Sequence, residues 1–477
     1  MDSNTLAKCN QLLTGRWIDF SMLALAAFAW GATVLQSVRK VTELSLASEF
    51  AVFAVALVFF SALIWLLRRH RLQLFYSRST PVRGNALVLP LTIGIFLRIA
   101  WVVSFTALPT SDGATYLSLA NSLSRGEPYY VAGSFAFWPP GYPFFLAPWL
   151  LIFPASFAVP LSQIVLFSVS ALGVFRLAEK NASQEAAKIS VLLLAVWPNL
   201  IALSATPEKE MLVLALLPWA MHWMLGNSTR LLLCAGLALG ASVLVQPSLQ
   251  LAIPAIALLL IIRNGFRFIP GSIVFIIGAT LVIAPWTVRN YYVLGEFKLI
   301  STNGGNVLYR ANNPLANGGY TERGEVDLSH LGELELDRQS KDLALRWIRD
   351  NPMRFLALAI EKQVRFMGDD SVGVYSTFRA EGEKRDNRLY VPLKLFANFF
   401  WLCAWLLLAK LIADGNRLPE NIRILIWAWF YLFSLHSIFE SQGKYHVPVI
   451  WVLCIAIGVL CSYSSDRNFR KQNGEYK

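Results

Sequence analysis

A single carboxylate follows the third long apolar run of the chain. Asp112 lies in the segment TSDGATY, residues 110–116, a few positions beyond the end of that run. In a partly desolvated site that raises its pKa towards the working pH, such a carboxylate could take the proton of an acceptor hydroxyl. A helix cap or a loop acid is the other interpretation of this position. We therefore predict Asp112 as a candidate general base.

Two further acids, Glu208 and Glu210, lie in the segment ATPEKE, residues 205–210, between two other apolar runs. Either could face the same cavity as Asp112, where a second acid would orient the acceptor or hold a divalent metal. Glutamates are also common at helix starts, where they complement the helix dipole. Glu208 is predicted as a second catalytic acid and Glu210 as a substrate-binding residue. No metal ligand and no certain cofactor are assigned, and a divalent metal stays open.

Cations stand at the ends of two apolar runs later in the chain. Arg289 follows PWTV, residues 285–288, and Lys444 and His446 lie in QGKYHVP, residues 442–448. Such groups could bind a lipid phosphate and stabilise the negative charge that grows on it as it leaves. Long basic side chains at span ends are also common membrane anchors, so both interpretations stay open.

Arg98 interrupts the third apolar run near its middle. A lone charge at that depth is costly unless it is paired or hydrated. We expect Arg98 to face protein or a cavity, where it either binds substrate or pairs with another helix.

The composition indicates which elements must position these residues. Of the 477 residues, 56% are hydrophobic and 15% are charged, unlike soluble globular domains. Runs long enough to cross a hydrocarbon core of about 30 Å recur, and only helices can form such spans here. We predict an all-α polytopic membrane protein with about twelve transmembrane helices, external juxtamembrane helices and a small external domain. The predicted spans are 17–36, 50–67, 86–107, 157–178, 189–205, 211–225, 231–245, 249–262, 269–288, 391–412, 424–439 and 447–461.

Basic residues in short loops set the orientation, because cytoplasmic loops carry an excess of Lys and Arg. This rule places both termini in the cytoplasm and the site on the external, periplasmic face of the cell inner (plasma) membrane. It explains the net charge of +12 by topology, so no nucleic-acid partner is predicted. The residues used are Arg68, Arg69, Arg71, Arg78, Arg83, Arg176, Lys180, Lys188, Arg230, Arg263, Arg267, Arg417, Arg423, Arg467, Arg470 and Lys471.

The first apolar run is interpreted as a retained span, since no small-residue cleavage site follows it. The five cysteines fall in apolar runs or in segments predicted to lie inside the cell, so no disulfide framework is implied. Walker, dinucleotide-binding, Cys/His metal and nucleophile-elbow motifs are all missing from the sequence. Asp369 and Asp370 form a weak metal signal and are interpreted as solvated loop acids.

Two stretches outside the spans are too long to be simple connections. The first holds WPPGYP, residues 138–143, and then a short apolar piece typical of a helix lying at the membrane interface. The second holds two amphipathic helical patterns, 337–349 and 353–367, broken at Asn351-Pro352. The predicted units are three N-terminal spans (1–107), a first external catalytic loop (108–156), central spans (157–288), an external domain (289–390), C-terminal spans (391–463) and a cytoplasmic tail (464–477).

The order and spacing of these segments resemble the C-type membrane glycosyltransferases, in the branch with protein O-mannosyltransferases and lipid A aminoarabinose transferases. The match runs from about Arg98 to near the end of the chain. Its pieces are Asp112 with Tyr116 and Ala120, Arg125-Gly126, 139–143, 206–208, 285–291, 301–305, 312–314, 348–352 and 444–448.

The resemblance implies an inverting transfer from a polyprenyl-phosphate sugar, with Asp112 as the base. It also implies substrate-binding roles for residues in the matched pieces: Tyr116, Tyr142, Arg289, Asn303, Lys444, Tyr445 and His446. Arg98 and Glu210, considered above from their positions, complete the predicted substrate-binding residues. Three departures stand out. Gly113 replaces a second acid, Gln246 replaces an arginine, and Lys444 and His446 replace arginines, which would make the phosphate site less strongly charged.

The chemistry agrees with this resemblance, because an outward-facing enzyme needs a donor that has already crossed the bilayer. The predicted partners are a polyprenyl-phosphate sugar, membrane lipids and an acceptor that is a glycan, a lipid or a protein. A lipid or glycan transporter without transferase chemistry is the alternative, although transporters often place polar features near the bilayer midplane. An inactive enzyme with the same fold is a third alternative, given Gly113 and Gln246.

Overall fold

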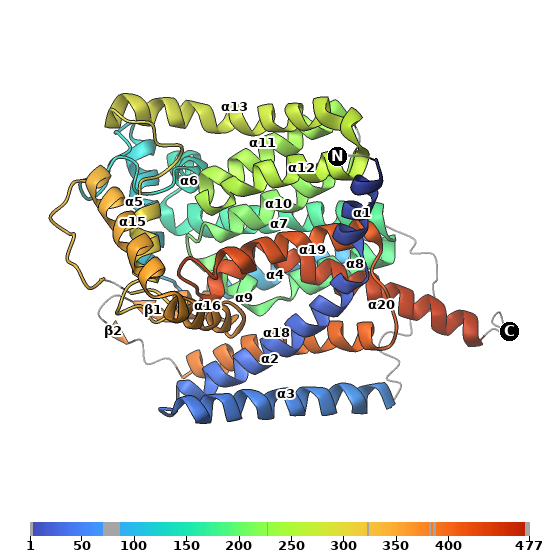
Figure 1. The fold of residues 1–477 in the computed structure, drawn as a ribbon. Helices are drawn as coiled ribbons and strands as arrows, with labels where there is room; N and C mark the ends of the chain where they lie inside the picture. Colours follow the sequence, from blue (N-terminus) through green and yellow to red (C-terminus); the bar gives the residue numbers. More distant parts are fainter. Residues whose placement is uncertain are drawn as a thin grey trace.

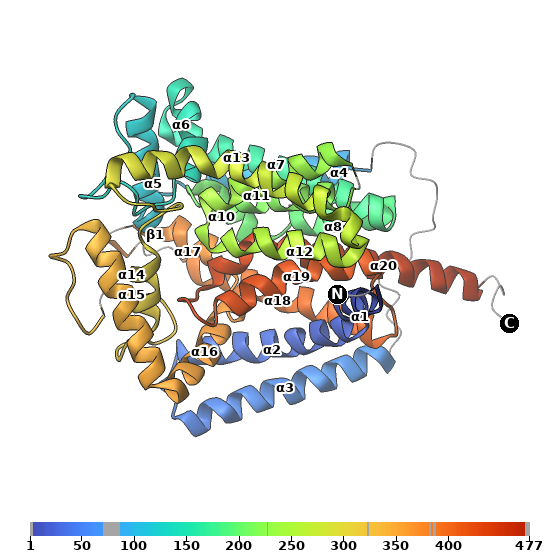
Figure 2. The ribbon, with the colours of Figure 1, turned by 45° about the horizontal axis from the view of Figure 1, so that its top comes forward.

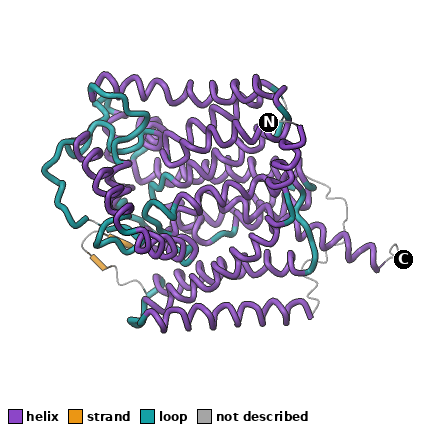
Figure 3. The backbone as a smooth tube through the Cα atoms, viewed as in Figure 1, coloured by secondary structure: helices purple, strands orange, loops and turns teal. Residues whose placement is uncertain are grey.

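The computed structural model describes residues 3–69, 86–226, 228–321, 324–380, 383–384 and 388–472. Helices dominate this part of the chain, as Figure 3 shows. Its regular strands are β1 (Arg379–Ala380) and β2 (Glu383–Lys384), which pair antiparallel. Of the basic residues that set the predicted orientation, Arg71, Arg78 and Arg83 lie outside the described residues. The side chains of Arg467, Arg470 and Lys471 are also outside the description.

The first half of the chain forms the N-terminal hairpin, the first loop helices and the central bundle. Its helices are α1 (Ser3–Thr14), α2 (Trp17–Arg39), α3 (Leu46–Arg69), α4 (Val88–Ser104), α5 (Ser111–Ser124), α6 (Gly141–Ile152), α7 (Ala155–Asn181), α8 (Gln184–Ala195), α9 (Pro198–Ala202), η1 (Leu203–Ala205), α10 (Glu210–Met224), α11 (Thr229–Val245), η2 (Pro247–Leu251), α12 (Ala252–Asn264), η3 (Phe266–Phe268) and α13 (Ile269–Leu294).

The second half adds four helices before the C-terminal spans. Its helices are α14 (Gly304–Ala311), α15 (Glu333–Asp350), α16 (Pro352–Met367), α17 (Val372–Phe378), α18 (Tyr390–Ala413), α19 (Glu420–Leu435), η4 (Gly443–Val449) and α20 (Ile450–Gln472).

The long helices run side by side, and the shorter ones gather at one end of the bundle. Figures 1 and 2 both place α5, α6, α15 and α16 at this end, and α1 with the end of α20 at the other. Figure 2 shows α14 beside α15. We call the first of these the loop end. Segments far apart in the sequence therefore meet there, which is the condition for a shared site.

Each of the twelve predicted spans overlaps a helix, and the all-α polytopic fold is confirmed. By length and composition, seven helices of the described residues can cross a membrane, or eight if the bent pair of α8 with α9 and η1 is one span. Helices α4, α10, α11 and α19 have only 15 to 17 residues. At 1.5 Å per residue, 15 residues cover about 22 Å, which is short of a full crossing.

The predicted span 189–205 is not one straight helix. It bends by 57° between α8 and the α9–η1 pair. Pro198 opens α9, and a proline cannot continue the hydrogen-bond ladder of the preceding helix. The bend turns the side chains of Trp197 and Asn199 towards the segment between α16 and α17, which they contact.

Small residues in the sequence allow two helices of the bundle to pack closely, and the apolar helices differ in how deeply they are buried. Gly236 and Gly240 of α11 face α13, where a Cβ would come within 2.1 Å of the Phe275 carbonyl oxygen and 2.6 Å of the Ala279 carbonyl oxygen. Small residues four apart are a common way for membrane helices to approach closely. The apolar span Gly443–Tyr463, which consists of η4 and the first part of α20, is 94% buried, whereas α3 is 11% buried, so α3 presents its apolar faces to the surroundings.

The loop end confirms three sequence predictions and adds one element. Helix α6 lies where an interfacial helix is predicted, and α15 and α16 correspond to the two amphipathic patterns with a break at Asn351. Juxtamembrane helices are predicted within residues 108–156, but no prediction gives the position of α5. Helix α5 places Asp112 in the first turn of a helix rather than in a loop.

Candidate active site

The carboxylate of Asp112 is joined to a cation from the other end of the sequence. Lys444, the second residue of η4, places its Nζ 2.9 Å from Asp112 Oδ2. This ammonium lowers the pKa of Asp112 to about 2, against the opposing effect of burial, and Lys209 and Arg310 lower it further. The expectation of a raised pKa for Asp112 is therefore wrong. The cation that binds this carboxylate stabilises its charged form.

Glu208 lies beside the Asp112–Lys444 pair, and hydrogen bonds to its backbone hold it in place. Gln163 Nε2 donates to the carbonyl oxygens of Thr206 at 2.9 Å and Glu208 at 3.2 Å, which fixes the turn before α10. The hydroxyl of Ser376 donates to Glu208 Oε1 at 3.1 Å. Burial raises the pKa of Glu208 to about 7; Glu210 and Asp112 raise it too, while Lys444 and Ser376 act in the opposite direction.

Glu210 is the first residue of α10 and is 1% exposed. Neither of its carboxylate oxygens has a hydrogen-bond partner among the described residues. In the described ranges, no three His, Cys, Asp or Glu side chains are arranged to hold a metal ion.

A second cation and carboxylate lie next to the first pair, and the sequence analysis missed both. Arg310 Nη2 is 3.3 Å from the Glu440 carboxylate, and the Tyr445 hydroxyl donates to Glu440 Oε1 at 3.1 Å. Lys209, also missed, lies 5.7 Å from the ring centre of Tyr116. Arg310 and Glu440 stand just before the matched segments 312–314 and 444–448, which was the available signal.

Tyr116 and Tyr142, both predicted to bind substrate, form a buried aromatic cluster next to the acids. Their ring centres are 5.8 Å apart, and Tyr116 also packs 5.6 Å from Trp138. Gln163 Nε2 donates to the Tyr142 hydroxyl at 3.0 Å, so the aromatic cluster is tied to the Glu208 turn. At 2% and 0% exposure, these two rings support the site rather than line its opening.

Arg289 is predicted to lie with Lys444 near Asp112, but its guanidinium contacts the loop between α5 and α6 instead. Its guanidinium donates to the carbonyl oxygens of Phe135 at 2.8 Å and Tyr129 at 3.0 Å, and lies 4.5 Å from the ring centre of Trp286. The cations that act on Asp112 are Lys444, Lys209 and Arg310. Arg289 therefore fixes the loop between α5 and α6.

His446, which is predicted to bind the donor phosphate, lies buried in the bundle, and its ring nitrogens contact two other residues there. It is 0% exposed, its Nδ1 lies 2.6 Å from the Phe366 carbonyl oxygen, and its Nε2 lies 3.0 Å from Asp370 Oδ1. The ring stacks on Trp401 at 4.5 Å. A fully buried imidazole with both nitrogens engaged has none left for a lipid phosphate.

Asp370 is likewise not the solvated acid predicted from the sequence, because it is 0% exposed. Its carboxylate accepts from Trp197 Nε1 at 2.6 Å and from Asn199 Nδ2 at 2.5 Å. Asp369 is partly exposed and pairs with Lys40 at 2.6 Å.

Arg98 and Asn303 complete the predicted set. Arg98 is 0% exposed and faces protein: its Nη1 donates to the carbonyl oxygens of Gly94 and Ala195, both at 3.0 Å, and its guanidinium lies 3.5 Å from the ring centre of Phe167. Asn303 precedes α14 and accepts from the Ser301 hydroxyl at 2.9 Å. Its side chain makes no capping hydrogen bond to α14, the helix that carries Arg310.

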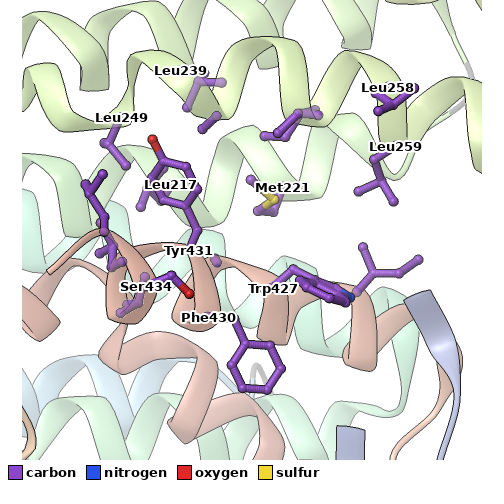
Figure 4. Close-up of a pocket in the computed structure, with 18 of the residues that line it drawn as sticks. Leu217, Met221, Leu239, Leu249, Leu258, Leu259, Trp427, Phe430, Tyr431 and Ser434 are labelled. Carbon is purple, nitrogen blue, oxygen red and sulfur yellow. The ribbon is translucent and has the colours of Figure 1, made fainter. Parts of the chain in front are cut away.

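An apolar groove of about 550 Å³ runs along the bundle towards these charges. Figure 4 shows Leu249 and Ser434 near one end and Leu259 and Trp427 near the other. Its walls come mainly from α12 and α19, with Leu217 and Met221 of α10 and Leu239 of α11. Ile438 and Val449 also line it, and they flank the segment that carries Glu440 and Lys444. The groove and the charged cluster therefore share one segment.

Residues 138–290 match the family model of dolichyl-phosphate-mannose-protein mannosyltransferases. The predicted resemblance to C-type membrane glycosyltransferases is confirmed for this stretch, about a third of the chain. The stretch spans α6 to most of α13 and contains Glu208, whereas Asp112 and Lys444 lie outside it. No curated protein sequence matches the chain.

Solved structures with a related arrangement are distant. The oligosaccharyltransferase of Archaeoglobus fulgidus is 15% identical with a TM-score of 0.47, over 82% of this chain and 51% of that one. ArnT from Cupriavidus metallidurans bound to undecaprenyl phosphate is 16% identical with a TM-score of 0.43, over 81% and 62%. The chain thus spans about half to three fifths of the length of these proteins.

Proposed function

We propose that the chain is a glycosyltransferase that moves a sugar from a polyprenyl-phosphate donor to an acceptor hydroxyl and inverts the anomeric carbon. The observation that carries this proposal is the Asp112–Lys444 pair, which lies beside Glu208 and shares a segment with an apolar groove. A lipid-linked phosphate has the two properties that such a site would recognise, an anionic head and a long apolar tail.

The groove supports an apolar chain of this kind. Its lining includes Leu217, Met221, Leu239 and Leu259, and burial of each methylene group contributes about 0.8 kcal/mol. The tail would lie among these residues while the head reaches the polar cluster. The matched family is named for a dolichyl-phosphate mannose donor, which has this composition.

The charges support the chemistry. Lys444, Arg310 and Lys209 surround Asp112 and would stabilise the phosphate as it leaves, which is where fixed positive charge lowers a barrier most. A carboxylate within the cluster would take the proton of the acceptor hydroxyl. Both groups come from helices and short turns that are packed in place, so little reorganisation is needed.

The distribution of basic residues supports an external site. Arg69 ends α3, Arg230 lies in the first turn of α11 and Arg263 lies in the last turn of α12, all away from the loop end. The positive-inside rule then places the termini in the cytoplasm and the loop end on the outer side of the cell inner membrane.

Transfer in isolated membranes tests the proposal. Membranes from cells that lack the gene, supplied with the wild-type chain and a radiolabelled polyprenyl-phosphate sugar, are expected to move label from the lipid to another product. Lys444→Met is expected to reduce transfer by about 100-fold, the typical effect of removing one stabilising charge. Lys188→Met is the control, since Lys188 lies on α8 next to Glu185.

Two outcomes would contradict this function. Appearance of intact labelled donor in the opposite leaflet without any new bond would identify a transporter. Absence of product with mannose, glucose and aminoarabinose donors alike would identify a protein that keeps the fold without the reaction.

A further inference from the structure

We propose that Glu208, rather than Asp112, takes the proton of the acceptor hydroxyl, and that Asp112 serves to hold Lys444 in position. This inference rests on the proposed transfer and divides its work between two acids. The acceptor oxygen forms a bond to the anomeric carbon, and the bond from that carbon to the donor phosphate breaks. Its electron pair stays on the phosphate, the acceptor proton moves to Glu208, and Glu208 later releases it to water.

The carboxylate of Asp112 is already bound to a cation, which makes it a poor base. Its Oδ2 accepts from the Lys444 ammonium at 2.9 Å. A carboxylate held in such a charge-assisted bond keeps its charge and has little affinity for a further proton, in agreement with its pKa of about 2. The same bond fixes the ammonium of Lys444, whose backbone is set by η4. Asp112 thus acts on the reaction through the cation that it orients.

Glu208 has a different set of contacts. It accepts a neutral hydroxyl, that of Ser376, and in the described part of the chain no Lys, Arg or His nitrogen lies within the 4.0 Å ion-pair distance of its carboxylate. The charged groups that act on it are Lys444 from η4, Glu210 from α10 and Asp112 from α5. Burial and the two acids raise its pKa to about 7, where a general base works best.

Close packing of α5 on the Glu208 turn brings the two acids together. A Cβ built on Gly113 would come 3.2 Å from Pro207 Cγ and 3.4 Å from the Pro207 carbonyl oxygen. Glycine at this position therefore lets α5 approach the turn closely. Asp112 precedes this contact on one segment and Glu208 follows it on the other, so both acids reach one small volume.

The pH dependence of transfer separates the two roles. With the labelled donor, wild-type kcat is expected to fall as the pH drops below about 7, because the base becomes protonated. Glu208→Gln is expected to lower kcat by about 100-fold and to abolish this fall. Asp112→Asn is expected to raise the KM for the donor and to leave the fall in place. We call this fall of kcat below about pH 7 the acid limb. If Asp112→Asn removes the acid limb and Glu208→Gln preserves it, the assignment is overturned.

A milder variant keeps the test usable where Glu208→Gln fails to fold. Ser376→Ala removes a hydrogen bond that favours the charged carboxylate, so the acid limb is expected to move to higher pH. Ser168→Ala is the control, since Ser168 donates to the Ile164 carbonyl oxygen within α7. A limb that stays in place in Ser376→Ala counts against Glu208.

Infrared difference spectra of the full chain in lipid vesicles measure the protonation of the Glu208 carboxyl group in the absence of any sugar donor. Burial also raises the pKa of Glu440 and of Asp370, so the spectra of Glu208→Gln are subtracted from those of the wild type. Between about pH 5.5 and 8.5, the difference is expected to contain a protonated-carboxyl band that titrates, and the same band is expected in Asp112→Asn. Wild-type and Glu208→Gln spectra that titrate identically would overturn the proposal. A normal band together with no sugar transfer would instead reject the proposed function, so the two failures are distinguishable.

Discussion

The imidazole of His446 lies between Asp370 and a backbone carbonyl, with Nε2 3.0 Å from the Asp370 carboxylate. The carbonyl of Phe366 accepts from Nδ1, so the proton on Nδ1 is fixed and the second nitrogen faces the acid. Asp370 in turn accepts from Trp197 and Asn199 at the bend before α9. One buried pair therefore connects η4, which carries Lys444, to α9 and to the end of α16.

Replacement of His446 is expected to destabilise the fold. His446→Gln removes a fully buried imidazole that contacts the Phe366 carbonyl and the Asp370 carboxylate. A buried polar group left without its partner typically costs about 1–3 kcal/mol of the free energy of unfolding. Thermal unfolding in detergent measures the loss, and His330→Gln is the control because His330 is exposed. A variant of normal stability that no longer binds the donor would instead make His446 a phosphate ligand.

Replacement of Arg289 is expected to release the loop between α5 and α6. Arg289→Gln removes the charged donor to the Tyr129 and Phe135 carbonyl oxygens, which ties this loop to α13. Hydrogen–deuterium exchange at residues 129–135 should accelerate. Arg289→Lys should give an intermediate rate, since lysine has no planar fork. Arg267→Gln, at the exposed start of the same span, should leave this exchange unchanged.

Unaltered exchange together with weaker donor binding would reverse this interpretation of Arg289. It would mean that the guanidinium leaves the loop to bind phosphate.

Hydropathy predicted where the helices lie, because a run of some 20 apolar residues is a local property of the chain. It did not predict α5, whose buried positions Tyr116, Leu119 and Ala120 are set among polar residues. It also missed the bend before α9, since a moving average of hydropathy does not register the geometric effect of Pro198.

The site was predictable only in part. Asp112 and Lys444 were expected to converge, and they do, at a sequence separation of 332 residues. The contacts of Arg289 and His446 were not predictable, because they include the backbone carbonyls of Phe135 and Phe366, which no side-chain motif reveals. Arg310 and Glu440 neutralise each other across 130 residues, a relationship that appears only once the chain is folded.

Filling the apolar groove is expected to weaken binding of long-chain donors selectively. Leu217→Trp and Leu239→Trp place indoles where an isoprenoid chain would lie. The KM for a full-length polyprenyl donor should rise about tenfold or more, while that for a short-chain donor should change little, because only the long tail enters the groove.

Leu281→Trp is the matched control, since Leu281 is 59% exposed on α13 and does not line the groove. Equal effects on both donors would mean that the groove does not hold the tail.

The contact between Gly113 and Pro207 gives the last prediction. In Gly113→Ala the new methyl group would lie 3.2 Å from Pro207 Cγ, so the turn before α10 must shift by a few tenths of an ångström. Because Glu208 follows directly, its carboxylate should move relative to Asp112, and kcat should fall several-fold with an unchanged KM for the donor. Pro207→Ala removes the opposing ring atoms, so the double variant Gly113→Ala/Pro207→Ala should recover part of the rate. Single-turnover transfer measures both. A rate that is unchanged in Gly113→Ala, or that the second substitution lowers further, would show that the spacing of α5 from this turn does not control the reaction.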